Sequence, residues 1–284
     1  MLKFSCADFT FPVLERAPAL KLVKLLGFDH ADIGLFARSS HFSPIELQAS
    51  PRKYTTRTLR DLNAAALKVS DIFVQIGVDP SECAANDPSQ AVRSKTRDTF
   101  AHALEFCVAL GCRHLTGLPG VFHPGVPRNR DLQLAEKEAS WRVSQCASAG
   151  VTYAIEPHVG SICGDVKSTR TFLRQVEGLT LTLDYGHFVM AGESSPLVHE
   201  LVRFASHIHV RGGAPKRLQT SVNENEIDFD GMLIGLTLRD FDGFLCLEYV
   251  WIDWNGCNRT DNVSETILLR RALETTIGRL ATAS

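Results

Sequence analysis

The sequence shows no surplus of charge of either sign, since 30 lysine and arginine residues face 32 aspartate and glutamate residues among 284. A general nucleic-acid binder, or a protein held to anionic membranes, needs a basic surplus to neutralise phosphates. No run approaches the roughly 18 apolar residues of a membrane helix, and charges interrupt residues 1–24, where a signal peptide needs an apolar stretch. We therefore expect a cytoplasmic protein that binds neither nucleic acid nor membranes.

Closely spaced cysteine pairs are missing as well. The eight cysteines are scattered, none forms a CxxC pair, and some, such as Cys107 and Cys246, stand between apolar residues. Because nothing in the sequence suggests secretion, we expect buried free thiols rather than disulfides.

Glycine-rich phosphate loops are also absent, because neither GxGxxG nor GxxxxGK[ST] occurs. This counts against an open, doubly wound sheet, the second choice of fold. Short β-rich runs instead alternate with helical stretches that end at a glycine, as at Gly111 and Gly150. The predicted strands are Lys3–Cys6, His30–Gly34, Val69–Ile76, Arg113–Thr116, Val151–Glu156, Thr180–Asp184, His207–Val210 and Phe244–Glu248.

Repeats of strand, helix and glycine predict right-handed βαβ units and a parallel sheet. The length is close to the roughly 250 residues of a (β/α)8 barrel, and 44% hydrophobic residues can fill its core. We predict one domain over residues 1–284, a single (β/α)8 TIM barrel with eight parallel strands. The longest connections, 35–52 and 117–131, follow strands, where such barrels keep their active-site loops.

Four predicted strands in the second half end in a residue that can bind a metal. These residues are Glu156, Asp184, His209 and Glu248. Period-2 alternation puts each on the inward face of its strand, so all four are expected to converge at one rim. A single strand-end carboxylate often caps the next helix, but four together favour a metal site. Three carboxylates and an imidazole suit one Mn, Mg or Co ion, with Zn as a further option.

Two further polar residues are expected to lie in the core. His207 shares a face with His209 but lies one layer deeper, so it is assigned to the core or to a place beside the ligands. Asp32 is assigned to packing.

Four segments carry a resemblance to a known family. They are Ile155-Glu156-Pro157-His158, Leu183-Asp184-Tyr185-Gly186-His187, His207-Ile208-His209-Val210-Arg211 and Leu247-Glu248-Tyr249. Together they resemble the xylose isomerase-like TIM-barrel superfamily, which holds sugar-phosphate isomerases and epimerases and apurinic endonuclease family 2. The resemblance spans nearly the whole chain. It implies a divalent metal on the four rim residues, Glu156 and Glu248 as a catalytic acid/base pair, and substrate contacts from His187 and Arg217.

The chemistry of a hydroxy-ketone agrees with these roles. Chelation of its carbonyl and neighbouring hydroxyl acidifies the C–H between them. One glutamate can then remove the proton to give a cis-enediolate, and a proton returned elsewhere isomerises or epimerises the sugar. The sequence therefore predicts a metal-dependent isomerase or epimerase of a keto-sugar or another carbohydrate.

One departure from the ketose epimerases supports an alternative. These enzymes carry a substrate-binding glutamate six residues after the first ligand, where this chain has Ile162. His158 stands instead two residues after Glu156, a pair that resembles the 3-dehydroshikimate and inosose dehydratases. There such a histidine can act as the base of a β-elimination. A metal-dependent lyase of a keto-sugar or keto-cyclitol is the alternative function, and a place in the cavity wall is the plainer role of His158.

Two other functions are less favoured. An apurinic endonuclease of this superfamily needs a trinuclear zinc site with further histidines, and the predicted strand Val69–Ile76 offers none. A non-catalytic sugar-binding protein is expected to have lost a ligand, and all four are present. The sequence leaves a homo-oligomer open.

Overall fold

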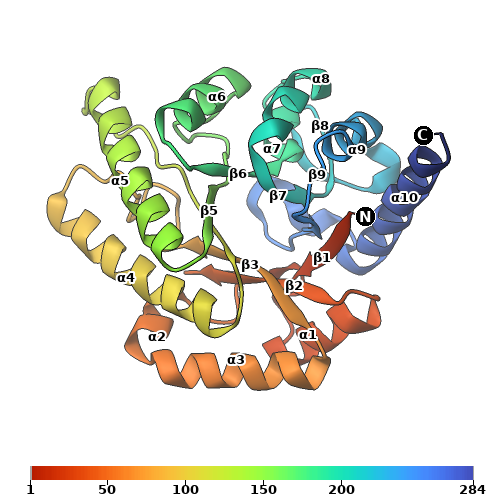
Figure 1. Ribbon diagram of the computed structural model, residues 1–284, viewed down its shortest axis with the longest axis horizontal. Helices are drawn as coiled ribbons and strands as arrows, with labels where there is room; N and C mark the ends of the chain where they lie inside the picture. Colours follow the sequence, from red (N-terminus) through yellow and green to blue (C-terminus); the bar gives the residue numbers. More distant parts are fainter. Residues whose placement is uncertain (1, 284) are drawn as a thin grey trace.

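The computed structural model describes residues 2–283 and forms a closed barrel of parallel strands (Figure 1). Their order around the barrel is β1-β10-β7-β6-β5-β4-β3-β2. The barrel strands are β1 Lys3–Ala7, β2 His30–Phe36, β3 Lys68–Gln75, β4 His114–Gly117, β5 Thr152–Ile155, β6 Thr180–Asp184, β7 Ala205–Val210 and β10 Phe244–Leu247. The predicted (β/α)8 barrel is confirmed, and each predicted strand is present.

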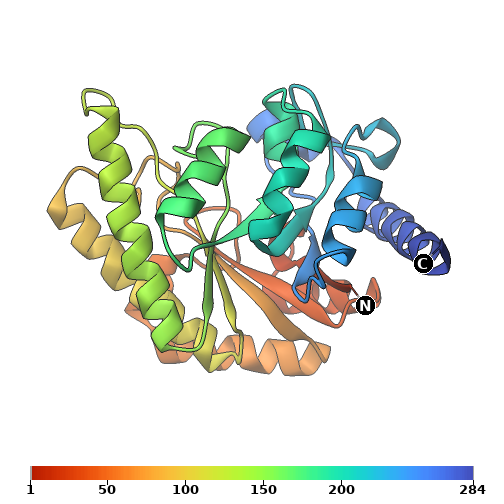
Figure 2. The same cartoon turned by 45° about the horizontal axis from the view of Figure 1, so that its top comes forward.

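Helices surround the barrel on the outside (Figure 2). The α-helices are α1 Arg16–Leu25, α2 Pro44–Ala49, α3 Pro51–Ala65, α4 Gln90–Ala109, α5 Arg128–Ser148, α6 Val166–Gln175, α7 Tyr185–Met190, α8 Ser195–Val198, α9 Phe229–Thr237 and α10 Asn262–Ala283. Short 3-10 helices are η1 Asp8–Thr10, η2 His199–Phe204, η3 Val222–Glu224 and η4 Trp254–Arg259. Within residues 2–283, no helix is both long and apolar enough to cross a bilayer.

The barrel interior is polar along its axis. The hydroxyls of Thr116 and Thr182 lie 2.7 Å apart across it, and Ser5 donates a hydrogen bond to Asp32. Many of the residues that alternate with these along the strands are aliphatic and pack in the core between the strands and the helices. Leu181, for example, is completely buried there. All eight cysteines are free, and seven of them are buried, as expected.

Backbone hydrogen bonds extend past the ends of β5 and β10. The amide of Glu156 donates to the carbonyl of Gly117, and the amide of Glu248 donates to the carbonyl of Val210. Both glutamates are therefore held in the register of the barrel although they lie one residue beyond their strands. This fixes where their side chains leave the rim.

A small hairpin follows β7 and was not predicted. Strands β8 Gly212–Ala214 and β9 Arg217–Thr220 pair antiparallel, with Gly212 opposite Thr220. A Cβ at Gly212 would lie 2.6 Å from the carbonyl oxygen of Thr220, so only glycine permits this close approach. The hairpin sets the position of Arg217, the first residue of β9.

Candidate active site

A cavity of about 560 Å³ opens at the carboxyl ends of the strands. Its polar lining includes Glu156, His158, His187, Arg211 and Glu248. Much of the remaining wall is aromatic or aliphatic, with contributions from Phe9, Phe36, Phe73, Leu118, Val250, Ile252 and Trp254. Mostly apolar walls with a few convergent polar groups are typical of small-molecule sites.

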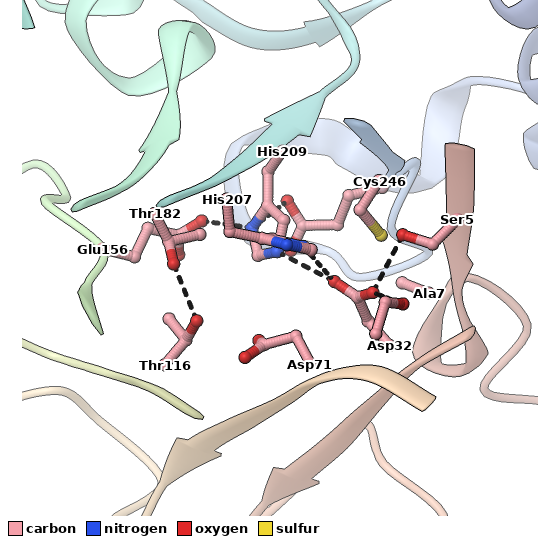
Figure 3. Close-up of polar contacts among 12 residues, drawn as sticks. Ser5, Ala7, Asp32, Asp71, Thr116, Glu156, Thr182, His207, His209 and Cys246 are labelled. Carbon is pink, nitrogen blue, oxygen red and sulfur yellow. Dashed lines mark hydrogen bonds and ion pairs between the residues drawn. The ribbon is translucent and has the colours of Figure 1, made fainter. Parts of the chain in front are cut away.

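His209 lies next to Glu156, another of the predicted metal ligands (Figure 3). Its Nδ1 is 2.5 Å from Oε1 of Glu156 and 3.3 Å from Oε2 of Glu248. Donor atoms of these three residues lie within 4.8 Å of one another, as do those of Glu156, Asp184 and His187. Oε2 of Glu248 is buried without a hydrogen-bond partner. The four predicted ligands therefore lie together in two overlapping groups, and their donors fit a divalent cation.

The charges of this cluster also favour a cation. Burial raises the pKa of Glu248 to about 8, although His209 and Arg211 act in the opposite direction. Burial alone would lower the pKa of His209, but the charges of Glu248 and Glu156 raise it well above its usual value. Buried carboxylates that converge in this way are stabilised by positive charge at the point where they meet.

Asp184 occupies the junction between β6 and α7. Its Oδ1 accepts a 2.7 Å hydrogen bond from the Gly186 amide, so it caps the N-terminus of α7. Its Oδ2 accepts a hydrogen bond from Nη2 of Arg211. Burial opposes ionisation, yet the Arg211 guanidinium lowers the pKa of Asp184 below its usual value. The capping role considered for a single strand-end aspartate is thus present, alongside its place in the cluster.

The structure brings Arg211, and not Arg217, to this cluster. The side chain of Arg217 is 48% exposed, forms an ion pair with Glu224 at 3.2 Å, and does not line the cavity. It begins β9, and the cavity is lined instead by the next residue of that strand, Leu218. Arg211 directly follows β7 and continues the inward alternation of His207 and His209. That period-2 pattern was the signal that could have identified it.

His158 and His187 both line the cavity as neutral imidazoles. Burial lowers the pKa of both, that of His187 to about 4. Nδ1 of His158 is 3.0 Å from the carbonyl oxygen of Val159, so it carries the proton there. Its Nε2 is buried without a hydrogen-bond partner and is left as a free acceptor. His187 is arranged in the opposite way, because its Nε2 accepts from Arg211 and its buried Nδ1 has no partner.

Asp32 supports His209 from below the cluster (Figure 3). Its Oδ2 lies 2.6 Å from Nε2 of His207 and 3.4 Å from Nε2 of His209, while Ser5 and Ser70 donate to Oδ1. The 2.6 Å contact to His207 is a hydrogen bond, whereas the contact to His209 is an ion pair without one. A carboxylate behind a ligating histidine helps to orient its ring. Asp32 is therefore more than a packing residue, and His207 lies beside a predicted ligand as expected.

Replacing Asp32 with asparagine is expected to weaken Mn²⁺ binding about 10- to 100-fold, because His209 loses the carboxylate that orients its ring. Calorimetric titration of purified protein with Mn²⁺ measures the effect. Asp71→Asn is the matched control, since Asp71 is equally buried in the barrel but pairs with His114, at 2.6 Å. Equal affinities in Asp32→Asn and wild type would contradict the prediction.

A closed (β/α)8 barrel with buried glutamates, an aspartate and a histidine at its strand ends defines the class of this protein. The chain belongs to the xylose isomerase-like TIM barrel family, whose model matches residues 20–273. The resemblance found in the sequence is thus confirmed. No curated protein sequence matches the chain.

Solved structures show the same fold at low sequence identity. L-ribulose 3-epimerase matches with a TM-score of 0.77 and 15% identity over 100% of this chain and 98% of its own. AP endonuclease family 2 from Brucella melitensis matches with a TM-score of 0.71 and 19% identity, over 93% and 96%. The probable 3-DHS dehydratase AsbF from Bacillus anthracis matches with a TM-score of 0.70 and 15% identity, over 95% and 99%.

Proposed function

We propose that residues 1–284 form one catalytic domain, a divalent-metal-dependent isomerase or epimerase of a keto-sugar or related carbohydrate. The observation that carries this proposal is the meeting of Glu156 and Glu248 around His209 beneath one cavity. An epimerase of a keto-sugar, L-ribulose 3-epimerase, shares the fold across the whole chain. Family membership supports this reading, and the residues of the site supply the chemistry.

Glu156, Asp184, His209 and Glu248 would hold the metal ion. Their oxygen-rich donor set suits Mn, Mg or Co. A bound divalent cation would act as a Lewis acid that polarises the substrate carbonyl and acidifies the neighbouring C–H.

The protein side chains would then move the proton. One glutamate removes it from the carbon beside the carbonyl, and the other returns a proton from the opposite face. Return to the same carbon gives the epimer, and return to the neighbouring carbon gives the isomer. The neutral His187 offers its free Nδ1–H to a substrate oxygen, which fixes the orientation of the sugar.

His158 favours a lyase as the second candidate. Its Nε2 is an unpartnered acceptor at the cavity, with the other ring nitrogen held by the carbonyl of Val159. Such a nitrogen can remove a carbon-bound proton and, as the resulting imidazolium, return it to the departing neighbouring hydroxyl, which leaves as water. A structure of similar fold is named as a probable 3-DHS dehydratase.

Metal content and proton exchange test the proposal together. After loading with mixed Mn, Co, Mg and Zn and desalting, elemental analysis should find about one ion per chain, and Asp184→Ala should lose it. The loaded protein should exchange a carbon-bound proton of L-ribulose or D-tagatose in heavy water, followed by NMR. Loss of water from 3-dehydroshikimate would favour the lyase, and three zinc ions would favour a nuclease. No metal and no exchange on any substrate would contradict both enolising functions.

A further inference from the structure

Arg211 places a permanent positive charge inside the carboxylate cluster. The residue is 3% exposed, and its Nη2 contacts Oδ2 of Asp184. The same nitrogen is 3.4 Å from Oε2 of Glu248 and 3.4 Å from Nε2 of His187. One guanidinium nitrogen thus touches two of the proposed metal ligands and the neutral histidine beside them.

Both carboxylate oxygens of Asp184 are already in use. Oδ1 accepts from the Gly186 amide as the cap of α7, and Oδ2 accepts from Arg211. The cap cannot be given up without loosening the start of α7, so Oδ2 is the oxygen that a metal would take. A divalent cation and a guanidinium on the same oxygen repel each other strongly in a buried site.

The guanidinium of Arg211 is held at one point only. Its hydrogen bonds come from Nη2, and its Nε is buried without a partner. Arg211 also lines the 560 Å³ cavity, so space lies next to its side chain. Rotation of the side chain away from Asp184 therefore breaks only the polar contacts that Nη2 makes.

We propose that Arg211 is an internal counter-cation of the site, whose pairing with Asp184 and the binding of a metal by Asp184 exclude each other. Binding of the ion moves the guanidinium from Asp184 into the cavity, and loss of the ion lets it return. This inference rests on the metal site of the proposed function. It assigns Arg211 a direct influence on metal affinity. Arg217 cannot have this influence, because it pairs with Glu224 and does not line the cavity.

A merely structural arginine would behave differently when removed. Any loss of this guanidinium leaves the buried Asp184 without its arginine partner and leaves Glu248 with His209 alone, which destabilises the fold. Only a competing cation also makes the metal bind more tightly when it is lost. Metal affinity and thermal stability therefore separate the two roles without any measurement of catalysis.

The test is Arg211→Met, which keeps an unbranched, flexible side chain but is shorter and carries no charge. Calorimetric titration should show Mn²⁺ binding at least about tenfold more tightly than in the wild type. Without added metal the melting temperature should be lower than that of the wild type, and Mn²⁺ should raise it by more. Arg38→Met is the control, because Arg38 is an exposed arginine that lines the same cavity without an ion pair to the cluster. Its Mn²⁺ affinity should equal that of the wild type.

The Mn²⁺ titrations and the turnover of the wild type together test both the inference and the proposed function. Unchanged or weaker Mn²⁺ binding by Arg211→Met, with normal binding by the wild type, would overturn the inference and leave the metal-dependent function in place. Tighter binding in Arg211→Met, together with a metal-loaded wild type that turns over no keto-sugar, would support the inference and count against the function. No Mn²⁺ binding by any variant would overturn both. If Arg211→Met does not fold, Arg211→Gln replaces it, with the same expected direction.

Discussion

Replacing Glu156 or Glu248 with glutamine is expected to lower the turnover number for a keto-sugar by about a hundred- to ten-thousandfold. Glutamine keeps the shape of the side chain but can neither accept nor deliver the proton at neutral pH. Both glutamates are buried in contact with His209, so each exchange removes an ionisable group from the cluster. Initial rates of epimer formation, followed by NMR with saturating Mn²⁺, measure the loss.

Two controls make this result specific to proton transfer. Circular dichroism melting should show that both glutamine variants remain folded, and elemental analysis should show how much metal they keep. Glu138→Gln is the matched variant, because Glu138 is also a buried glutamate but pairs with Arg97 and Arg142 between α4 and α5. It should lose stability and keep its turnover number. Near-normal turnover in either Glu156→Gln or Glu248→Gln would show that the acid/base assignment is wrong.

Replacing His158 with asparagine should separate the two enolising reactions. For an elimination, rates should fall about a hundred- to ten-thousandfold, because the free Nε2 would be the base that starts the reaction. For an epimerisation, the loss should be about fivefold, the effect of one hydrogen bond to the substrate. Ultraviolet absorbance of the unsaturated product follows the first reaction, and NMR of the epimer follows the second.

His199→Asn is the companion variant, since His199 pairs with Tyr185 and Asp228 away from the cavity. It should leave both rates unchanged. A collapse of epimerisation in His158→Asn, as large as that of Glu156→Gln, would mean that the histidine itself moves the proton. The glutamates would then serve as ligands alone.

The sequence predicted the barrel and the convergence of four residues because both follow from local periodicity. Alternation along a strand tells which side chains face inward, and parallel strands of a barrel end at the same rim. Glu156 and Glu248 therefore came together in the structure as expected, although 92 positions separate them in the sequence. No knowledge of the loops was needed for this part of the site.

The remaining parts depend on geometry that short patterns do not encode. Asp32 reaches His207 across 175 positions of sequence, and the closure of the barrel, in which β1 lies between β2 and β10, brings it there. Arg217 was chosen from the resemblance, but the β8–β9 hairpin turns it outward. The turn at residues 215–216 and the close approach of Gly212 to Thr220 decide that outcome, and this backbone path is set by contacts rather than by periodicity.

The contact between Asp32 and His209 joins two halves of the chain that contribute different groups to the site. Residues 152–248 contribute every proposed ligand, whereas the half that contains β1, β2 and β3 contributes the carboxylate and hydroxyls behind them. An isolated C-terminal half-barrel would contain all four proposed ligands but would lack the carboxylate behind the imidazole of His209. The proposed ligands thus come from one half of the molecule, and the groups behind His209 come from the other.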